Sequence, residues 1–282
     1  MSRQKIPSEK GHFFRDLSQQ IKHHKSTFAV YIILRTLVIA AIVVSCIQRN
    51  YENLFVCVLS LILFMLPAFV EKNFRIELPS TLEIIILLFI FAAEILGELQ
   101  SYYLRYTMWD TMLHTINGFL CAAFGFGLVD ILNRNARIKF SLSPLYLAVA
   151  AFCFSMTIGV LWEFGECAAD LILRTDAQKD MMIHSISTVA LDPTLSNTPV
   201  QINDITQVII KTADGTVVTM DGYLDIGLLD TMKDLFVNFI GAIVFCIIGY
   251  FFSLHRGKGR FAKHFIPTLS EESSGERQEK SE

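Results

Sequence analysis

The stretch from Phe28 to Ile47 reads FAVYIILRTLVIAAIVVSCI and holds a single charged residue, Arg35. A helix of about 20 residues spans the hydrocarbon core of a bilayer and satisfies its own backbone hydrogen bonds there. Further apolar runs of similar length follow, at Leu54–Val70, Pro79–Glu98, Asp110–Leu132, Pro144–Ala168 and Leu235–Leu254. The sequence therefore predicts an all-α polytopic membrane protein with six transmembrane helices.

The composition supports a lipid environment. Hydrophobic residues make up 52% of the chain and charged residues only 18%, whereas a soluble domain has about a quarter of its residues charged. The net charge of −3 gives no electrostatic footprint for nucleic acid. The partner that the composition indicates is the lipid bilayer, with no nucleic acid.

The placement of lysine and arginine predicts the orientation. With six spans, 17 of these residues fall in the two termini and the connections on their side of the membrane, and six fall in the opposite connections. Because basic residues are enriched on the cytoplasmic side, we expect both termini to lie in the cytoplasm.

The chain then divides into four parts. Residues 1–26 form a basic cytoplasmic segment, in which residues 11–25 are either a short interfacial helix or a solvated leader. Residues 27–98 hold helices one to three, and residues 99–254 hold helices four to six with an extracytoplasmic cap at 170–229. In the cap, Val208–Thr212 and Thr216–Met220 flank Ala213-Asp214-Gly215, which predicts a β-hairpin. Residues 255–282 are expected to be a disordered cytoplasmic tail.

Pairs of ionisable residues occupy the predicted outer ends of four helices. Each pair is spaced i, i+3 or i, i+4 and so shares one helix face. The pairs are Glu94 with Glu98, Asp110 with His114, Glu163 with Glu166, and Asp230 with Asp234. Charges in a bilayer are costly and need partners; a bound cation could neutralise these carboxylates, some of them could be protonated, or the outermost could reach water.

Carboxylates with one histidine suit a divalent metal ion, of which zinc, manganese, magnesium and iron are candidates. The predicted metal ligands are His114, Glu163, Glu166, Asp234, Asp230, Glu94 and Glu98. Glu163 and Asp110 are the candidate catalytic groups. Asp110 orients His114 or supplies a further ligand, and one spare carboxylate of the set serves as general base. Asn117 and Asn238 are expected to support the ligands by hydrogen bonding.

The order of these motifs resembles two groups of bacterial inner-membrane proteins, the VanZ-like and YjdF-like proteins. Between residues 110 and 250 the matching segments are Trp109-Asp110-Thr111-Met112-Leu113-His114, Trp162-Glu163-Phe164-Gly165-Glu166 and Asp234-Leu235-Phe236-Val237-Asn238-Phe239-Ile240-Gly241. Glu166 stands where the VanZ-like pattern has glutamine. The resemblance implies a multi-pass protein of the bacterial cytoplasmic membrane with a role at the cell envelope.

Three functions remain open at this stage. The leading hypothesis is a metal-dependent hydrolase or phosphotransferase that acts on a lipid-linked envelope substrate. The second is a cation- or proton-coupled transporter, although the sequence shows little polar continuation toward the cytoplasm. The third is a non-catalytic envelope scaffold or resistance protein.

Overall fold

The structure, a computed structural model, describes residues 25–133, 142–255 and 257–269. The expected interfacial helix at 11–25 therefore lies outside the described residues, except for its last residue. The chain divides into two compact units, one formed by Met1–Met156 with Asn238–Glu282 and the other by Thr157–Val237. The long helices α8 (Pro144–Leu173) and α9 (Leu228–Leu254) each contribute residues to both units.

Five helices in the described part of the chain are long and apolar enough to cross a membrane. They span Ser26–Gln48, Tyr51–Phe74, Trp109–Asn133, Pro144–Leu173 and Leu228–Leu254. The first is α2 (Lys25–Gln48), and the third is α7 (Trp109–Asn133). The second consists of α3 (Tyr51–Leu63) and α4 (Leu66–Phe74), with Pro67 near the start of α4, where a missing backbone N–H is tolerated. Many side chains on these helices are apolar and exposed, as Ile33 at 57% and Phe55 at 68% show, and this is the surface that lipid covers.

The expected third span is helical but has two parts. Ser80–Ile90 forms the α-helix α5, and Phe91–Leu99 continues it directly as a π-helix, η1. The four-residue helix α6 (Tyr102–Arg105) follows. Because π-helical segments are rare and are frequent at functional sites, the position of Glu94 and Glu98 within η1 is notable. Neither α5 nor η1 alone has the length of a membrane span.

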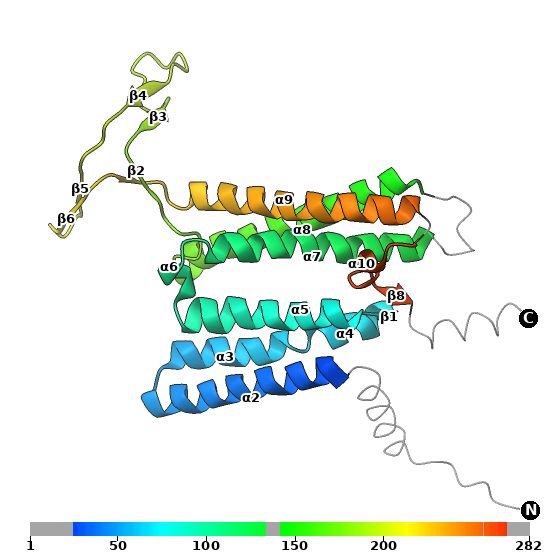
Figure 1. Cartoon of the computed structure of the whole chain (residues 1–282). Helices are drawn as coiled ribbons and strands as arrows, with labels where there is room; N and C mark the ends of the chain where they lie inside the picture. Colours follow the sequence, from blue (N-terminus) through cyan, green and yellow to red (C-terminus); the bar gives the residue numbers. More distant parts are fainter. Residues whose placement is uncertain (1–24, 134–141, 256, 270–282) are drawn as a thin grey trace, which may run out of the picture. The chain divides into compact units, whose positions relative to one another are not determined.

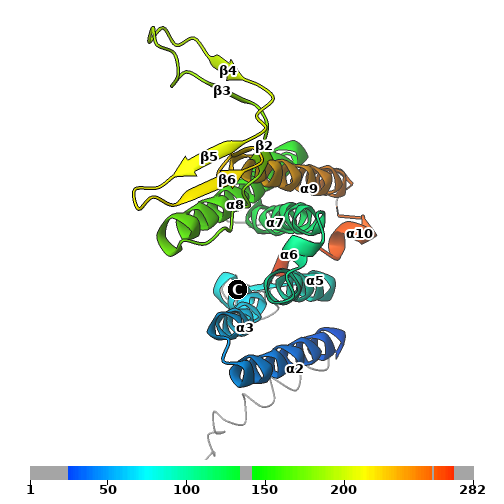
Figure 2. The same ribbon diagram turned by 90° about the vertical axis from the view of Figure 1, so that its left-hand side faces the viewer.

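Two apolar clusters form the core of the first unit. One lies among α2, α3, α5 and η1, where Leu34, Val38, Cys57 and Phe64 are buried. Figure 1 and Figure 2 show α2, α3 and α5 side by side in this region. The other cluster joins α7 to the parts of α8 and α9 that belong to this unit, and its largest fully buried side chains include those of Phe126 and Phe245.

The chain after α9 folds back against the first unit. The short helix α10 (Arg260–Lys263) leads to β8 (Thr268–Leu269), which pairs antiparallel with β1 (Ile76–Glu77). Between them Phe265 and Ile266 are buried in the α7–α9 cluster, and Figure 1 shows α10 and β8 beside this part of the unit. Residues 257–269 are thus folded, in contrast to the expectation of a disordered tail from residue 255, because their apolar side chains find a core to enter.

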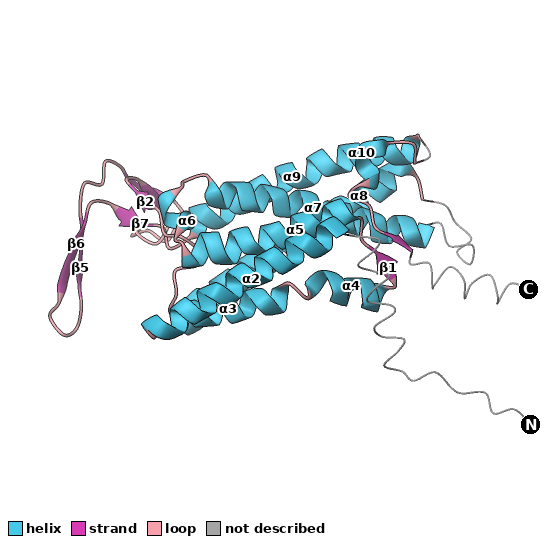
Figure 3. Cartoon of the chain, turned by 60° about the horizontal axis from the view of Figure 1, so that its bottom comes forward, coloured by secondary structure: helices cyan, strands magenta, loops and turns pink. Residues whose placement is uncertain are grey.

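The second unit carries the remaining strands. Met182–Ile183 (β2) pairs with Tyr223–Leu224 (β7), and Ile186–Thr188 (β3) pairs with Val200–Ile202 (β4). The predicted hairpin is present as β5 (Val208–Lys211) and β6 (Val217–Met220), shown in Figure 3. Its turn uses Gly215 at φ +89°, a left-handed conformation that favours glycine. The prediction of mainly helical structure with a small β-hairpin is confirmed.

Candidate functional site

The first turns of α7 carry the histidine of the predicted site. His114 Nε2 lies 3.4 Å from Asp110 Oδ1, and the two side chains are 11% and 24% exposed. The i, i+4 spacing on one helix produces this contact. Asp110 is in the first turn, where the positive end of the helix dipole favours a carboxylate. A carboxylate that contacts one ring nitrogen fixes the orientation of the imidazole and leaves the other nitrogen as a potential ligand atom.

One turn further along α7, two asparagines join this helix to α9. Asn117 Nδ2 donates to Asn238 Oδ1 over 3.2 Å, and Cys121 Sγ donates to Asn117 Oδ1 over 3.4 Å. Asn238 is 1% exposed, and its own amide nitrogen lies 3.6 Å from the sulfur of Met156 on α8. A buried amide without partners would be costly, so this network holds α7 and α9 in one arrangement. The sequence analysis named both asparagines as residues that support the metal ligands, a role that stays a prediction. It gave no signal for Met156.

Glycines allow the two helices to touch at the same level. A Cβ on Gly118 would lie 2.8 Å from the carbonyl carbon of Asn238, and a Cβ on Gly241 would lie 3.0 Å from the backbone nitrogen of Phe119. Both distances are shorter than almost all real Cβ contacts, so the backbones approach as closely as small residues permit. Ser155 Oγ on α8 donates to the Gly118 carbonyl over 2.8 Å and adds a third helix to this crossing.

Aromatic contacts show the relative direction of α7 and α9. The rings of Phe119 and Phe245 are 5.1 Å apart, and those of Phe126 and Phe252 are 6.5 Å apart. Together with the Asn117–Asn238 hydrogen bond, these pairs advance along both helices in the same order. Within this unit α7 and α9 therefore run parallel.

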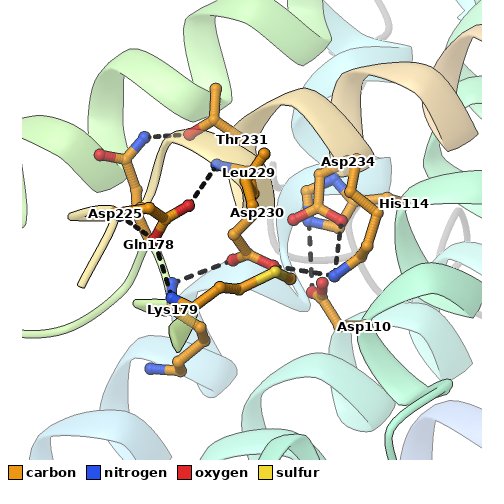
Figure 4. A network of polar contacts seen from close by, with 12 residues as sticks. Asp110, His114, Gln178, Lys179, Asp225, Leu229, Asp230, Thr231 and Asp234 are labelled. Carbon is orange, nitrogen blue, oxygen red and sulfur yellow. Dashed lines mark hydrogen bonds and ion pairs between the residues drawn. The ribbon is translucent and has the colours of Figure 1, made fainter. Parts of the chain in front are cut away.

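In the second unit, the start of α9 carries a compact charged network. Lys233 Nζ lies 2.8 Å from Asp230 Oδ1 and 3.5 Å from Asp234 Oδ1. The backbone nitrogen of Lys179 donates to the other oxygen of Asp230 over 3.0 Å, as Figure 4 shows. Asp230 and Asp234 are only 4% and 2% exposed, and the Lys233 side chain is 34% exposed. The ammonium of Lys233 thus contacts both buried carboxylates.

The loop before α9 holds this network in place. Asp225 accepts hydrogen bonds from the backbone nitrogens of Met181 and Leu229, each over 2.8 Å, and the side chain of Gln178 donates to Thr231. Desolvation raises the pKa of Asp225, but the backbone donors outweigh it and hold that pKa below its usual value. The contributions of Gln178 and Lys179 had no signal in the sequence, because they come from an irregular segment.

The glutamates of the predicted site have other surroundings. Glu163 on α8 is 4% exposed. Glu166 is partly buried and accepts a hydrogen bond from Trp162 Nε1 over 2.8 Å. Glu94 is partly buried and Glu98 is exposed, both on η1. Of the predicted ligands in the first unit, Asp110 and His114 lie together on α7. In the second unit, Asp234 lies with Asp230 and Lys233 at the start of α9. The metal-ligand roles of Glu94, Glu98, Glu163, Glu166 and Asp230 stay predictions.

Apolar helices of membrane-spanning length define a polytopic membrane protein. Buried carboxylates lie near the start of α9, and the partly buried Asp110–His114 pair lies near the start of α7. The chain belongs to the family described as "Predicted membrane protein (DUF2238)", whose model matches residues 30–255. It is also similar to an "Uncharacterized protein" of Thermotoga maritima, 27% identical over 107 residues, which cover 38% of this chain and 53% of that relative. The matched region thus spans about half of the relative's length. No solved structure matches the chain.

Proposed function

We propose that this protein is a divalent-metal-dependent membrane protein whose ion is held by three of the predicted ligands, Asp110, His114 and Asp234. The ligand types fit, since two carboxylates and one imidazole suit zinc, manganese or iron and leave coordination positions open.

The contact between Asn117 and Asn238 is the single observation that carries the proposal. It fixes the register of α7 and α9, and the helices run parallel from that point. His114 precedes Asn117 by about one turn of α7, and Asp234 precedes Asn238 by about one turn of α9, which is one unbroken helix from Leu228 to Leu254. Continuing both helices by this turn brings Asp234 beside His114 in our proposal.

The same crossing argues against a transport pathway. Beyond the asparagines, the α7–α9 contact is filled by Ala122, Phe126, Ala242 and Phe245, all with 0% exposure. A cation or proton route needs polar groups or water through the bilayer, and these described residues supply neither. A site next to this apolar crossing suits chemistry on an amphiphilic molecule better than passage through the protein.

We propose the corresponding topology and reaction. The α5–η1 run, Ser80–Leu99, is the sixth membrane crossing, both termini lie in the cytoplasm, and residues 174–227 lie on the outer side of a bacterial cytoplasmic membrane. The ion, when bound, would activate water for attack on phosphoryl or acyl centres, and the buried Glu163 is the candidate general base. The substrate class is a lipid-linked envelope molecule, cleaved by hydrolysis or phosphotransfer.

Elemental analysis of the purified protein tests the metal site. We expect close to one equivalent of Mn²⁺ or Zn²⁺ per chain after dialysis, and loss of that ion in His114→Ala and in Asp234→Asn. Glu98→Gln, a change at an exposed carboxylate outside the three proposed ligands, is the matched control and should retain the ion. Retention of the ion in both ligand variants, or no ion in the wild-type protein, overturns the proposal.

Release of inorganic phosphate from a polyprenyl diphosphate in mixed micelles tests the reaction. We expect release that requires the metal and that falls by about 10² or more in Glu163→Gln, because a general base contributes on that order. Equal release by wild-type and Glu163→Gln protein would remove Glu163 from the chemistry, and no release with metal bound would exclude this substrate class.

A further inference from the structure

The ammonium of Lys233 competes with any cation for Asp234. It forms an ion pair with that carboxylate over 3.5 Å, and the Lys233 side chain is only partly exposed. Two cations cannot occupy one carboxylate at close range without repulsion. Metal binding at Asp234 therefore requires Lys233 to be held elsewhere.

Asp230 provides that second position. Its Oδ1 lies 2.8 Å from Lys233 Nζ, closer than Asp234 does. The other Asp230 oxygen accepts from the backbone nitrogen of Lys179, so the carboxylate is fixed and oriented independently of Lys233. The i, i+3 spacing of Asp230 and Lys233 on α9 keeps this pair together whatever happens at Asp234.

We infer that Lys233 is a tethered counter-ion that occupies the Asp234 carboxylate without metal and moves fully onto Asp230 when a divalent cation binds. This inference rests on the proposed function, because it concerns access to the same site. Its consequence is that Asp230 assists metal binding without being a ligand: it retains the lysine that would otherwise block Asp234.

The arrangement resolves the charge problem in both states. Without metal, one ammonium is shared by two carboxylates that are almost fully buried. With metal, Lys233 and Asp230 form a neutral pair, and Asp234 is neutralised by the ion. Neither state leaves a buried carboxylate without a counter-charge, which would be strongly destabilising.

Mn²⁺ binding measured by EPR titration of the full-length protein in detergent or nanodiscs distinguishes this role from that of a ligand. Lys233→Met removes the competing charge and should tighten Mn²⁺ binding by about tenfold, the effect of a partly screened charge near the ion. Lys233→Arg retains a cation and should leave the affinity within about threefold of wild type. Lys179→Met is the matched control, because Lys179 contacts Asp230 through its backbone nitrogen, and should change nothing.

Asp230→Asn should change the Mn²⁺ affinity in the opposite direction to Lys233→Met. With its anchor neutralised, Lys233 pairs with Asp234 alone, and Mn²⁺ binding should weaken by about tenfold. In the Lys233→Met background the same Asp230→Asn change should have no effect, because there is no ammonium left to retain. A double-mutant cycle with this coupling supports the inference.

Other outcomes overturn the inference and remain distinct from failure of the metal site. If Asp230→Asn weakens Mn²⁺ binding equally in both backgrounds, Asp230 is a ligand. If Lys233→Met binds Mn²⁺ no more tightly than wild type, Lys233 is not a competitor. If no variant binds Mn²⁺, including Lys233→Met, the proposed function itself fails; circular dichroism on each variant confirms that the helices are intact.

Discussion

Replacing Gly241 by alanine tests the close crossing of α7 and α9 that supports the candidate site. A Cβ at this position would lie inside contact distance of the Thr115 carbonyl oxygen and 3.0 Å from the Phe119 backbone nitrogen. The neighbouring atoms are backbone and cannot rotate away, so the helices have to separate. Gly165→Ala is a matched control on α8, because nothing lies within 4 Å of a Cβ there.

The two variants should change stability in opposite directions. Overpacking in a close-packed interior costs about 1–3 kcal/mol. An alanine in a helix that tolerates it stabilises by about 0.4–1 kcal/mol through the unfolded state. We therefore expect Gly241→Ala to lower the free energy of unfolding by about 1–3 kcal/mol, and Gly165→Ala to leave it unchanged or raise it slightly.

Reversible unfolding in mixed micelles, followed by circular dichroism as the SDS fraction rises, measures both changes. Mn²⁺ binding by Gly241→Ala should weaken at the same time, since a wider crossing moves α9 away from α7. An equal stability for Gly241→Ala and Gly165→Ala would refute the close crossing as the structure has it.

Three further predictions follow from single contacts. Phe265→Ala should destabilise the protein by about 3–5 kcal/mol, as large truncations in a core do. Phe261→Ala, at a side chain that is 57% exposed, should cost much less. Equal thermal stabilities of the two variants would show that residues 257–269 are not part of the core. The pKa of Asp225 is lowered in the folded protein. Its stabilising contribution should therefore be complete above about pH 5 and should be lost as the pH falls below the pKa of an unfolded aspartate, about 3.9. Hydrogen exchange at Leu229 should show this loss in wild-type protein and not in Asp225→Asn. Gly215→Val should lower hydrogen-exchange protection in β5 and β6 by about 1–2 kcal/mol, because valine disfavours a positive φ; unchanged protection would contradict the turn geometry.

The apolar runs predicted the helices well because the bilayer leaves few alternatives. A run long enough to span lipid must be helical, whatever its neighbours do. The run at 79–98 was predicted as one helix, but hydropathy carries no signal for the change to π-helical hydrogen bonding at Phe91. The fold-back of Phe265 and Ile266 depends on distant partners, β1 and the α7–α9 cluster. The polar, Ser/Glu-rich composition of the C-terminal residues led to the prediction of disorder for this short apolar segment as well.

The candidate site was predictable to the extent that it depends on spacing within one helix. The contact of Asp110 with His114 follows from i, i+4 geometry. The asparagine pair needed the register of two helices separated by over a hundred residues, and only the order of motifs pointed to it. The division of Lys233 between Asp230 and Asp234 depends on rotamers and on a backbone donor from Lys179, neither of which a sequence pattern encodes.

Pulsed EPR of Mn²⁺ bound to protein labelled with ¹⁵N-histidine tests the central claim most directly. We predict a hyperfine coupling to a single histidine nitrogen, present in wild-type protein, absent in His114→Ala, and retained in Glu98→Gln. Asp234→Asn should weaken Mn²⁺ binding itself, since it removes a ligand charge. A Mn²⁺ signal without any nitrogen coupling, or a coupling that survives in His114→Ala, would contradict the assignment of the metal to Asp110, His114 and Asp234.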